Sequence, residues 1–180
     1  MKYMGIIGVI ILLAGMFMSM LLGSIHDNFS LRKNTISDLG APSKNTFHEI
    51  FNMSLSTSSI LFTIYCFYLQ TNNNLTLISI VGFCFLYIAM MSMFLLGVYH
   101  VEKRHELHTT LAYIMFSFMF LGIIFCDITT MVIENADIYD IICMIFFIGL
   151  GVLFFFKRTP LLEWIFFTMI IITCFPYIIR

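Results

Sequence analysis

A short polar segment, Asn34 to Gly40, carries the side chains best suited to chemistry in a sequence that is otherwise mostly apolar. It reads Asn-Thr-Ile-Ser-Asp-Leu-Gly. Ser37 and Asp38 could act with a histidine such as His105, because a nucleophile and its base need only be adjacent in space. No Gly-x-Ser-x-Gly elbow surrounds Ser37. These three residues are the catalytic candidates, and a serine-type lipid hydrolase or transferase is one hypothesis.

The histidines suggest a second kind of site. All five lie in or beside the loops that follow the first and third apolar spans, and four of them could converge at one end of a helix bundle. Zinc accepts three or four histidine or carboxylate ligands, so it is the cofactor that such a cluster would suit. The run from His105 to His108 does not have the four-residue ligand spacing of a His-Glu-x-x-His site. The candidate metal ligands are His48, His100, His105 and His108.

Binding without chemistry is another hypothesis. Basic side chains share the histidine-bearing loops, and basic pockets between helices bind anionic lipid headgroups. The first loop could fold back as a lid, with Ile36 and Leu39 in the bundle, Ser37 or Asp38 capping a short turn and Gly40 ending it. The candidate ligand-binding residues are Arg32, Lys33, Ser37, Asp38, His48, Asn52, His100, Arg104, His105 and His108.

The composition places these groups in a membrane protein. Of the 180 residues, 61% are hydrophobic and only 11% are charged, whereas a soluble domain carries about 25% charged residues. The net charge of −1 offers no argument for a nucleic-acid partner. The five cysteines all lie inside apolar segments, which favours small packing residues over a disulfide framework.

The pattern predicts an all-α fold: one polytopic domain, residues 1–180, with six transmembrane helices and a long lid-like first loop. A helix needs about 20 apolar residues to cross the hydrocarbon core, and lipid leaves the backbone few alternatives to helix. The expected spans are about Met4–Gly23, Phe47–Leu69, Leu75–Tyr99, Leu107–Ile133, Tyr139–Phe156 and Leu161–Ile179.

The charge of the loops predicts how the chain is oriented in the membrane. With six spans, the first, third and fifth loops share one side and hold seven of the nine lysines and arginines. Because cytoplasmic loops carry an excess of these residues, we expect the three loops in the cytoplasm and both termini outside.

Two features of the first two spans concern packing. Gly15, Ser19 and Gly23 recur every four residues, a stripe of small residues that allows a neighbouring helix to approach closely. We expect a homo-oligomer or a docking face for a partner there. His48 and Asn52 share a helical face, and we expect the Asn52 amide to face a partner.

Several of these residues also carry a family resemblance. The Asn34–Ala41 segment, Phe51-Asn52, and Gly97-Val98-Tyr99 followed by a histidine-bearing elbow resemble the small prokaryotic six-helix membrane proteins catalogued as domain of unknown function 998. The Ile-Ser-Asp-Leu-Gly segment is also similar to eukaryotic six-helix proteins of the Frag1/DRAM/Sfk1 type. The resemblance implies a six-helix fold in a prokaryotic cell membrane, and it implies no activity.

The sequence therefore leaves three hypotheses. The first is a membrane protein that binds a lipid headgroup or another amphiphile in a polar, histidine-rich pocket, with membrane lipid as its partner. The second is a metal-dependent or serine-type lipid hydrolase or transferase. The third is a structural or partner-binding membrane subunit.

Overall fold

Helices make up all the regular structure in the described part of the chain. The computed structural model describes residues 1–72, 76–99, 105–134, 138–157 and 159–179. The all-α prediction is confirmed within these ranges. The helices are α1 (Met4–His26), α2 (Ile36–Leu39), α3 (His48–Asn72), α4 (Leu77–Val98), α5 (His105–Glu134), α6 (Ile138–Phe156) and α7 (Pro160–Ile179).

Four helices are long and apolar enough to cross a membrane. They are α1, α3, α4 and the His105–Thr129 part of α5. In α6 and α7 the described apolar stretches are shorter, Met144–Phe156 and Pro160–Ile172. The chain is thus an integral membrane protein by the length and composition of these helices, while the count of six spans is not confirmed.

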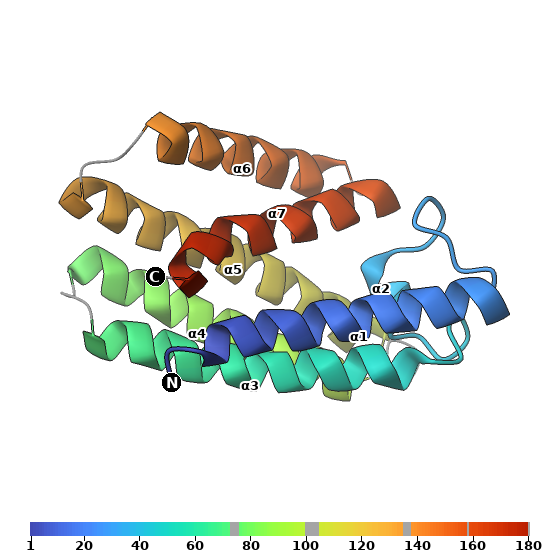
Figure 1. Cartoon of the computed structure of the whole chain (residues 1–180). Coiled ribbons are helices and arrows are strands. Elements are labelled where there is room, and N and C mark those ends of the chain that lie inside the picture. The colour runs from blue at the N-terminus through green and yellow to red at the C-terminus, as the bar shows by residue number, and fades with distance from the viewer. Residues whose placement is uncertain (73–75, 100–104, 135–137, 158, 180) are drawn as a thin grey trace.

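The long helices form a bundle in which sequence neighbours pack together. α1 packs on α3, α3 on α4, and α4 on α5, while α6 pairs with α7. Figure 1 shows α7 between this group and α6, and α7 also contacts α1, α2 and α5. The short α2 lies at one end of the bundle, and α1 begins and α7 ends toward the other (Figure 1). The bundle thus gathers the first loop and the starts of α5 and α7 at one end.

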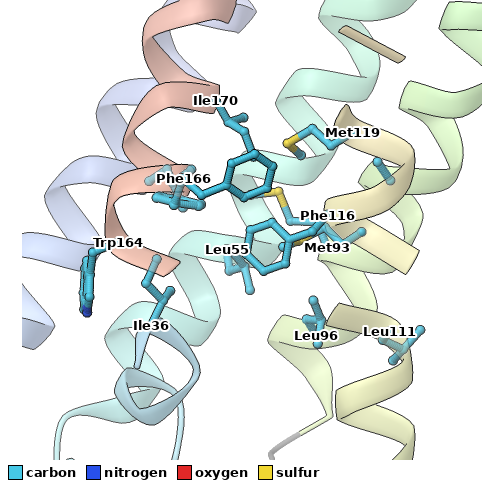
Figure 2. Packing of buried hydrophobic residues seen from close by; sticks show 14 of the residues in the cluster. Ile36, Leu55, Met93, Leu96, Leu111, Phe116, Met119, Trp164, Phe166 and Ile170 are labelled. Atoms are coloured by element: carbon cyan, nitrogen blue, oxygen red, sulfur yellow. The ribbon is translucent and has the colours of Figure 1, made fainter. Parts of the chain in front are cut away.

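The core is built from aromatic and methionine side chains, and it includes the first loop. Figure 2 shows Phe116, Phe166, Met93 and Met119 meeting between the helices, with Ile36 entering from below. Leu39 is fully buried in the same cluster. The expectation that Ile36 and Leu39 enter the bundle is confirmed. Their burial stabilises the closed loop by about 2 kcal/mol per side chain relative to exposure to water.

The small residues of α1 contact α3 and the first loop of the same chain. A Cβ atom on Gly15 would strike the Ser54 side chain, and one on Gly23 would lie 3.0 Å from Asn45 Oδ1. Ser19 is fully buried, and its Oγ donates a hydrogen bond to the Phe47 carbonyl over 3.2 Å. The expected close approach therefore occurs, but within one chain. The homo-oligomer expected from this stripe stays a prediction.

Candidate functional site

A cavity of about 280 Å³ opens at the α2 end of the bundle. Its walls come from the first loop, the start of α5, the end of α6 and the start of α7. It therefore joins segments that are far apart in the sequence. The lining residues are Thr35, Ser37, Asp38, His105, His108, Thr109, Ala112, Phe116, Phe154, Thr159, Pro160 and Glu163.

The lining changes from polar to apolar along α5. His105, His108 and Thr109 lie in its first two turns, and Ala112 and Phe116 follow deeper in the span. From His105 to Phe116 the helix rises about 16 Å at roughly 1.5 Å per residue. The lining changes in the opposite direction along α6, from apolar to polar. Phe154 lies inside the helix, and Thr159 lies beyond its end. The cavity thus has a polar mouth and an apolar floor.

Asp38 forms part of the wall through a capping box on α2. Its Oδ2 accepts hydrogen bonds from the Thr35 backbone N–H over 2.9 Å and from Asn34 Nδ2 over 3.4 Å, and Thr35 Oγ1 accepts from the Asp38 N–H over 3.2 Å. This reciprocal pair satisfies two donors that a helix start leaves exposed. The N-cap residue is therefore Thr35, and the expectation that Ser37 or Asp38 caps the turn is confirmed for Asp38, which completes the capping box. The Thr-x-x-Asp spacing is the signal in the sequence that could have identified Thr35.

The end of α2 is also packed closely. Gly40 ends the helix as predicted, although its φ is −88°, outside the left-handed region. A Cβ atom there would strike Asn52 Oδ1, and Asn52 Nδ2 donates to the Gly40 carbonyl over 3.2 Å. The expectation that Asn52 faces a partner is confirmed. Gly40 is needed here for close approach rather than for backbone conformation.

Two of the four candidate histidine ligands line the cavity. His108 is buried, and its Nδ1 lies 3.1 Å from the Tyr99 carbonyl, which requires Nδ1 to donate. His105 is exposed at the first position of α5. His48 is outside the lining, with its Nδ1 3.2 Å from the Asn45 carbonyl, and His100 is outside the described residues. Within the described ranges, no group of three or more His, Cys, Asp or Glu side chains is arranged to hold a metal ion.

Ser37 and Asp38 share the cavity with His105 and His108, but no hydrogen bond between described residues joins them to either histidine. Asp38 Oδ1 and the Ser37 hydroxyl have no hydrogen-bond partner in the described part of the chain. Both groups are therefore available to a molecule in the cavity.

The basic candidates stand apart from the lining. Arg32 and Lys33 are exposed and do not line the cavity, and Arg104 is outside the described residues. No lysine or arginine is present among the described lining residues. The wall instead contains two carboxylates, those of Asp38 and Glu163.

The sequence matches the family described as Protein of unknown function (DUF998) over residues 6–175. That match covers nearly the whole chain. The chain belongs to the DUF998 family. No curated protein and no solved structure matches it. Membership of DUF998 confirms the resemblance seen in the sequence, and it supplies a family without an assigned activity.

In this DUF998 chain, two residues that sequence reasoning missed hold the first loop in place. Trp164 on α7 donates from Nε1 to the Asn34 carbonyl over 3.0 Å, across 130 positions of sequence. Asn45 is 1% exposed, and its Nδ2 donates to Ser19 Oγ over 2.7 Å and to the Leu39 carbonyl over 3.0 Å. The sequence offered one signal for the role of Trp164, which is the only tryptophan in the chain.

A third contact closes the loop at its base. Asp27, just after α1, accepts from the Thr46 backbone N–H over 2.8 Å and from the Thr46 hydroxyl over 2.9 Å. These two hydrogen bonds hold the pKa of the Asp27 carboxyl below its usual value, with a smaller contribution from His26. The contact ties the two ends of the loop together beside the start of α3.

This contact predicts a pH effect. A carboxyl whose pKa is lowered by folding stabilises the fold above its unfolded pKa, and that contribution is lost as the pH falls through the folded pKa. We expect the melting temperature of the wild type in detergent to exceed that of Asp27→Asn at about pH 6, and the gap to shrink toward about pH 3. Glu49→Gln, at an exposed carboxylate in the first turn of α3, is the control. A gap that stays constant over this range would contradict the prediction.

Proposed function

We propose that this DUF998 protein binds the headgroup end of a membrane lipid in the cavity under its first loop. One observation carries the proposal: the cavity passes from a polar mouth to an apolar floor along α5. An amphiphile has the same gradient, so its headgroup would meet the mouth and the first part of its chain would meet Ala112 and Phe116. A cavity of about 280 Å³ is slightly smaller than the roughly 300–1,000 Å³ of sites for whole small ligands, which suits a headgroup rather than an entire lipid.

The start of α5 supports a phosphate in this headgroup. His105 begins α5 and lines the cavity. Helix N-termini favour anions because their first backbone N–H groups lack intrahelical acceptors. The Ser37 hydroxyl, which has no partner in the described residues, adds a donor at the same end.

The proposal includes the membrane topology. We propose that α6 and α7 also cross the membrane, since they have 19 and 20 residues and a span needs about 20. The cavity would then open at one interface of a prokaryotic cell membrane. The excess of lysine and arginine in the first, third and fifth loops supports a cytoplasmic position for this end.

Blocking the floor of the cavity tests the binding. Ala112→Phe places a ring in the apolar part of the lining, so we expect it to reduce the lipid retained on the purified protein about tenfold, because the lost burial of a chain segment costs roughly 1–2 kcal/mol. Native mass spectrometry of the detergent-purified protein measures retention. The matched control is Ala14→Phe, on an exposed position of α1.

The proposal would be overturned if Ala112→Phe retained as much lipid as the wild type. Melting temperatures would show that Ala112→Phe and Ala14→Phe are both folded. Retention that falls equally in Ala14→Phe would also overturn the proposal, because the lipid would then belong to the outer surface of the bundle.

Chemistry on the bound lipid is the second candidate function. Ser37, His105 and His108 line one cavity, and this favours it. Asp38 is engaged in the capping box, however, and no hydrogen bond within the described part of the chain connects Ser37 to a histidine. Binding is therefore the better supported function. The hypothesis of a purely structural subunit loses its expected docking face, because Gly15, Ser19 and Gly23 are covered by the chain itself.

A further inference from the structure

The cavity wall is shared by two parts of the bundle. One side comes from the first loop and α5, and the other comes from the end of α6 and the start of α7. α1, α3, α4 and α5 pack on one another in sequence order, whereas α6 pairs with α7. α6 begins at the far end of the bundle, where it follows α5, and it reaches the cavity only at its own end (Figure 1). The cavity therefore lies on the seam between the two parts.

The first loop is fixed to the α1 and α3 side of this seam. Asn45 Nδ2 donates to Ser19 Oγ on α1 over 2.7 Å. Asn52 Nδ2 on α3 donates to the Gly40 carbonyl at the end of α2 over 3.2 Å. These hydrogen bonds join the loop to two helices that also pack on each other. The loop therefore belongs to the body of the bundle, and a movement that opens the cavity is more easily made by α6 and α7.

Aromatic rings deeper in the bundle hold α6 and α7 against α5. The Phe120 ring of α5 lies 5.1 Å from the Phe147 ring of α6 and 6.0 Å from the Phe166 ring of α7, measured between centroids. Phe120 follows Phe116, which lines the cavity floor, by one helical turn. Aromatic pairs interact over centroid separations of about 4.5–7 Å, so a small rotation does not break these contacts. The rings can therefore act as a pivot below the cavity.

A hydrogen bond crosses the seam at the cavity end. Trp164 Nε1 on α7 donates to the Asn34 carbonyl of the first loop over 3.0 Å, and the Trp164 side chain is only 8% exposed. Neither residue lines the cavity, although Glu163 and Thr35 beside them do. This contact can therefore control how far the wall opens without touching a bound molecule.

We propose that the cavity-side ends of α6 and α7 form a gate, which turns about the rings around Phe120 and moves away from the first loop to admit the lipid. The hydrogen bond from Trp164 to Asn34 is the latch of this gate. A single neutral hydrogen bond adds little net stability, so the latch can open without unfolding the bundle. The inference rests on the proposed function, since it gives the entry route to the same cavity.

The test follows how fast the bound lipid is replaced. The full-length protein is reconstituted in vesicles that contain equal amounts of phosphatidylethanolamine and phosphatidylglycerol, extracted in detergent, and mixed with an excess of the same lipids carrying deuterated acyl chains. Native mass spectrometry then gives the amount of retained lipid and the rate of its replacement.

Trp164→Phe keeps a ring and removes the N–H donor. We expect it to replace its lipid about fivefold faster than the wild type, the usual effect of one hydrogen bond. The amount retained at equilibrium should not change, because Trp164 does not line the cavity and a looser gate speeds entry and exit alike.

A second variant weakens the latch from the loop side. Asn34 Oδ1 accepts from the Ser30 N–H over 3.0 Å, which helps to hold the Asn34 carbonyl in place. Asn34→Ala should therefore also speed replacement, and it carries the test if Trp164→Phe does not fold. The double variant should be no faster than Trp164→Phe alone, because both substitutions act on one contact.

Tyr87→Phe is the matched control. It also keeps a ring and removes one hydrogen bond between helices, from the Tyr87 hydroxyl on α4 to Gln70 Oε1 on α3 over 2.8 Å. Neither of these residues lines the cavity. We expect Tyr87→Phe to replace its lipid at the wild-type rate.

The outcomes separate the gate from lipid binding itself. A wild-type rate in Trp164→Phe, or an equal acceleration in Tyr87→Phe, overturns the gate and leaves the proposed function intact. A loss of retained lipid in Trp164→Phe at an unchanged rate also overturns the gate, because Trp164 would then act on affinity. Additive rates in the double variant overturn the assignment of the latch. If the wild type retains no lipid, the proposed function and this inference both fail.

Discussion

Gly97→Ala is expected to destabilise the fold by about 2–3 kcal/mol, because it forces apart two packed helices. A Cβ atom on Gly97 of α4 would strike Ser56 Oγ and lie 3.0 Å from the Ser56 backbone nitrogen on α3. Backbone atoms cannot rotate away as a long side chain can, so α4 would have to shift. The measurement is thermal unfolding in detergent.

The control for this variant is Gly149→Ala on α6, where an added Cβ atom would have nothing within 4 Å. Alanine is the better helix former by about 1 kcal/mol, so this variant should be neutral or slightly stabilising. Equal melting temperatures for the two variants would contradict close packing of α3 against α4 at Gly97.

Asn45→Ala is expected to lower the free energy of unfolding by about 3 kcal/mol and to loosen the first loop, because it leaves three polar groups without their partner. In the wild type, Asn45 Nδ2 donates to Ser19 Oγ and to the Leu39 carbonyl, and Asn45 Oδ1 accepts from the Phe47 N–H over 3.0 Å. The Leu39 carbonyl lies at the end of α2, so losing this contact should release the wall that carries Asp38. Thermal unfolding and hydrogen exchange of residues 30–46 would measure the two effects.

Asn72→Ala is the matched control, since the Asn72 amide is exposed and donates within its own helix to the Tyr68 carbonyl over 2.8 Å. A surface substitution of this kind changes stability by roughly 0.5 kcal/mol or less. If Asn45→Ala behaved like Asn72→Ala, the buried hydrogen bonds would not hold the loop.

Local sequence patterns predicted the positions of the helices well. Runs of apolar residues placed the first four long helices close to their observed ends: α1 begins at Met4, as expected, and continues to His26. Gly40 ends α2, also as expected. Such features are readable because a helix depends on the hydropathy of its own residues and on caps within one turn.

The site was predicted only in part, because it depends on contacts between distant residues. The sequence marked Ser37, Asp38, His105 and His108 as candidates, and the bundle brings these four to one cavity. The same reasoning grouped His48 with them and assigned Arg32 and Lys33 to the site, whereas all three are outside the lining. Sequence spacing says which residues share a helical face, but not which way that face turns.

The sequence was sufficient for the membrane class, the helical elements and the polar segment from Asn34 to Gly40, since these follow from local hydropathy and capping. Tertiary packing alone assigned Asp38 and Glu163 to the wall of one cavity, and it covered the small residues of α1 with α3 and the first loop. It also joined Trp164 to Asn34 across 130 positions. These outcomes depend on how helices rotate and approach one another, which is decided by the fit of the whole core and not by any short stretch of residues.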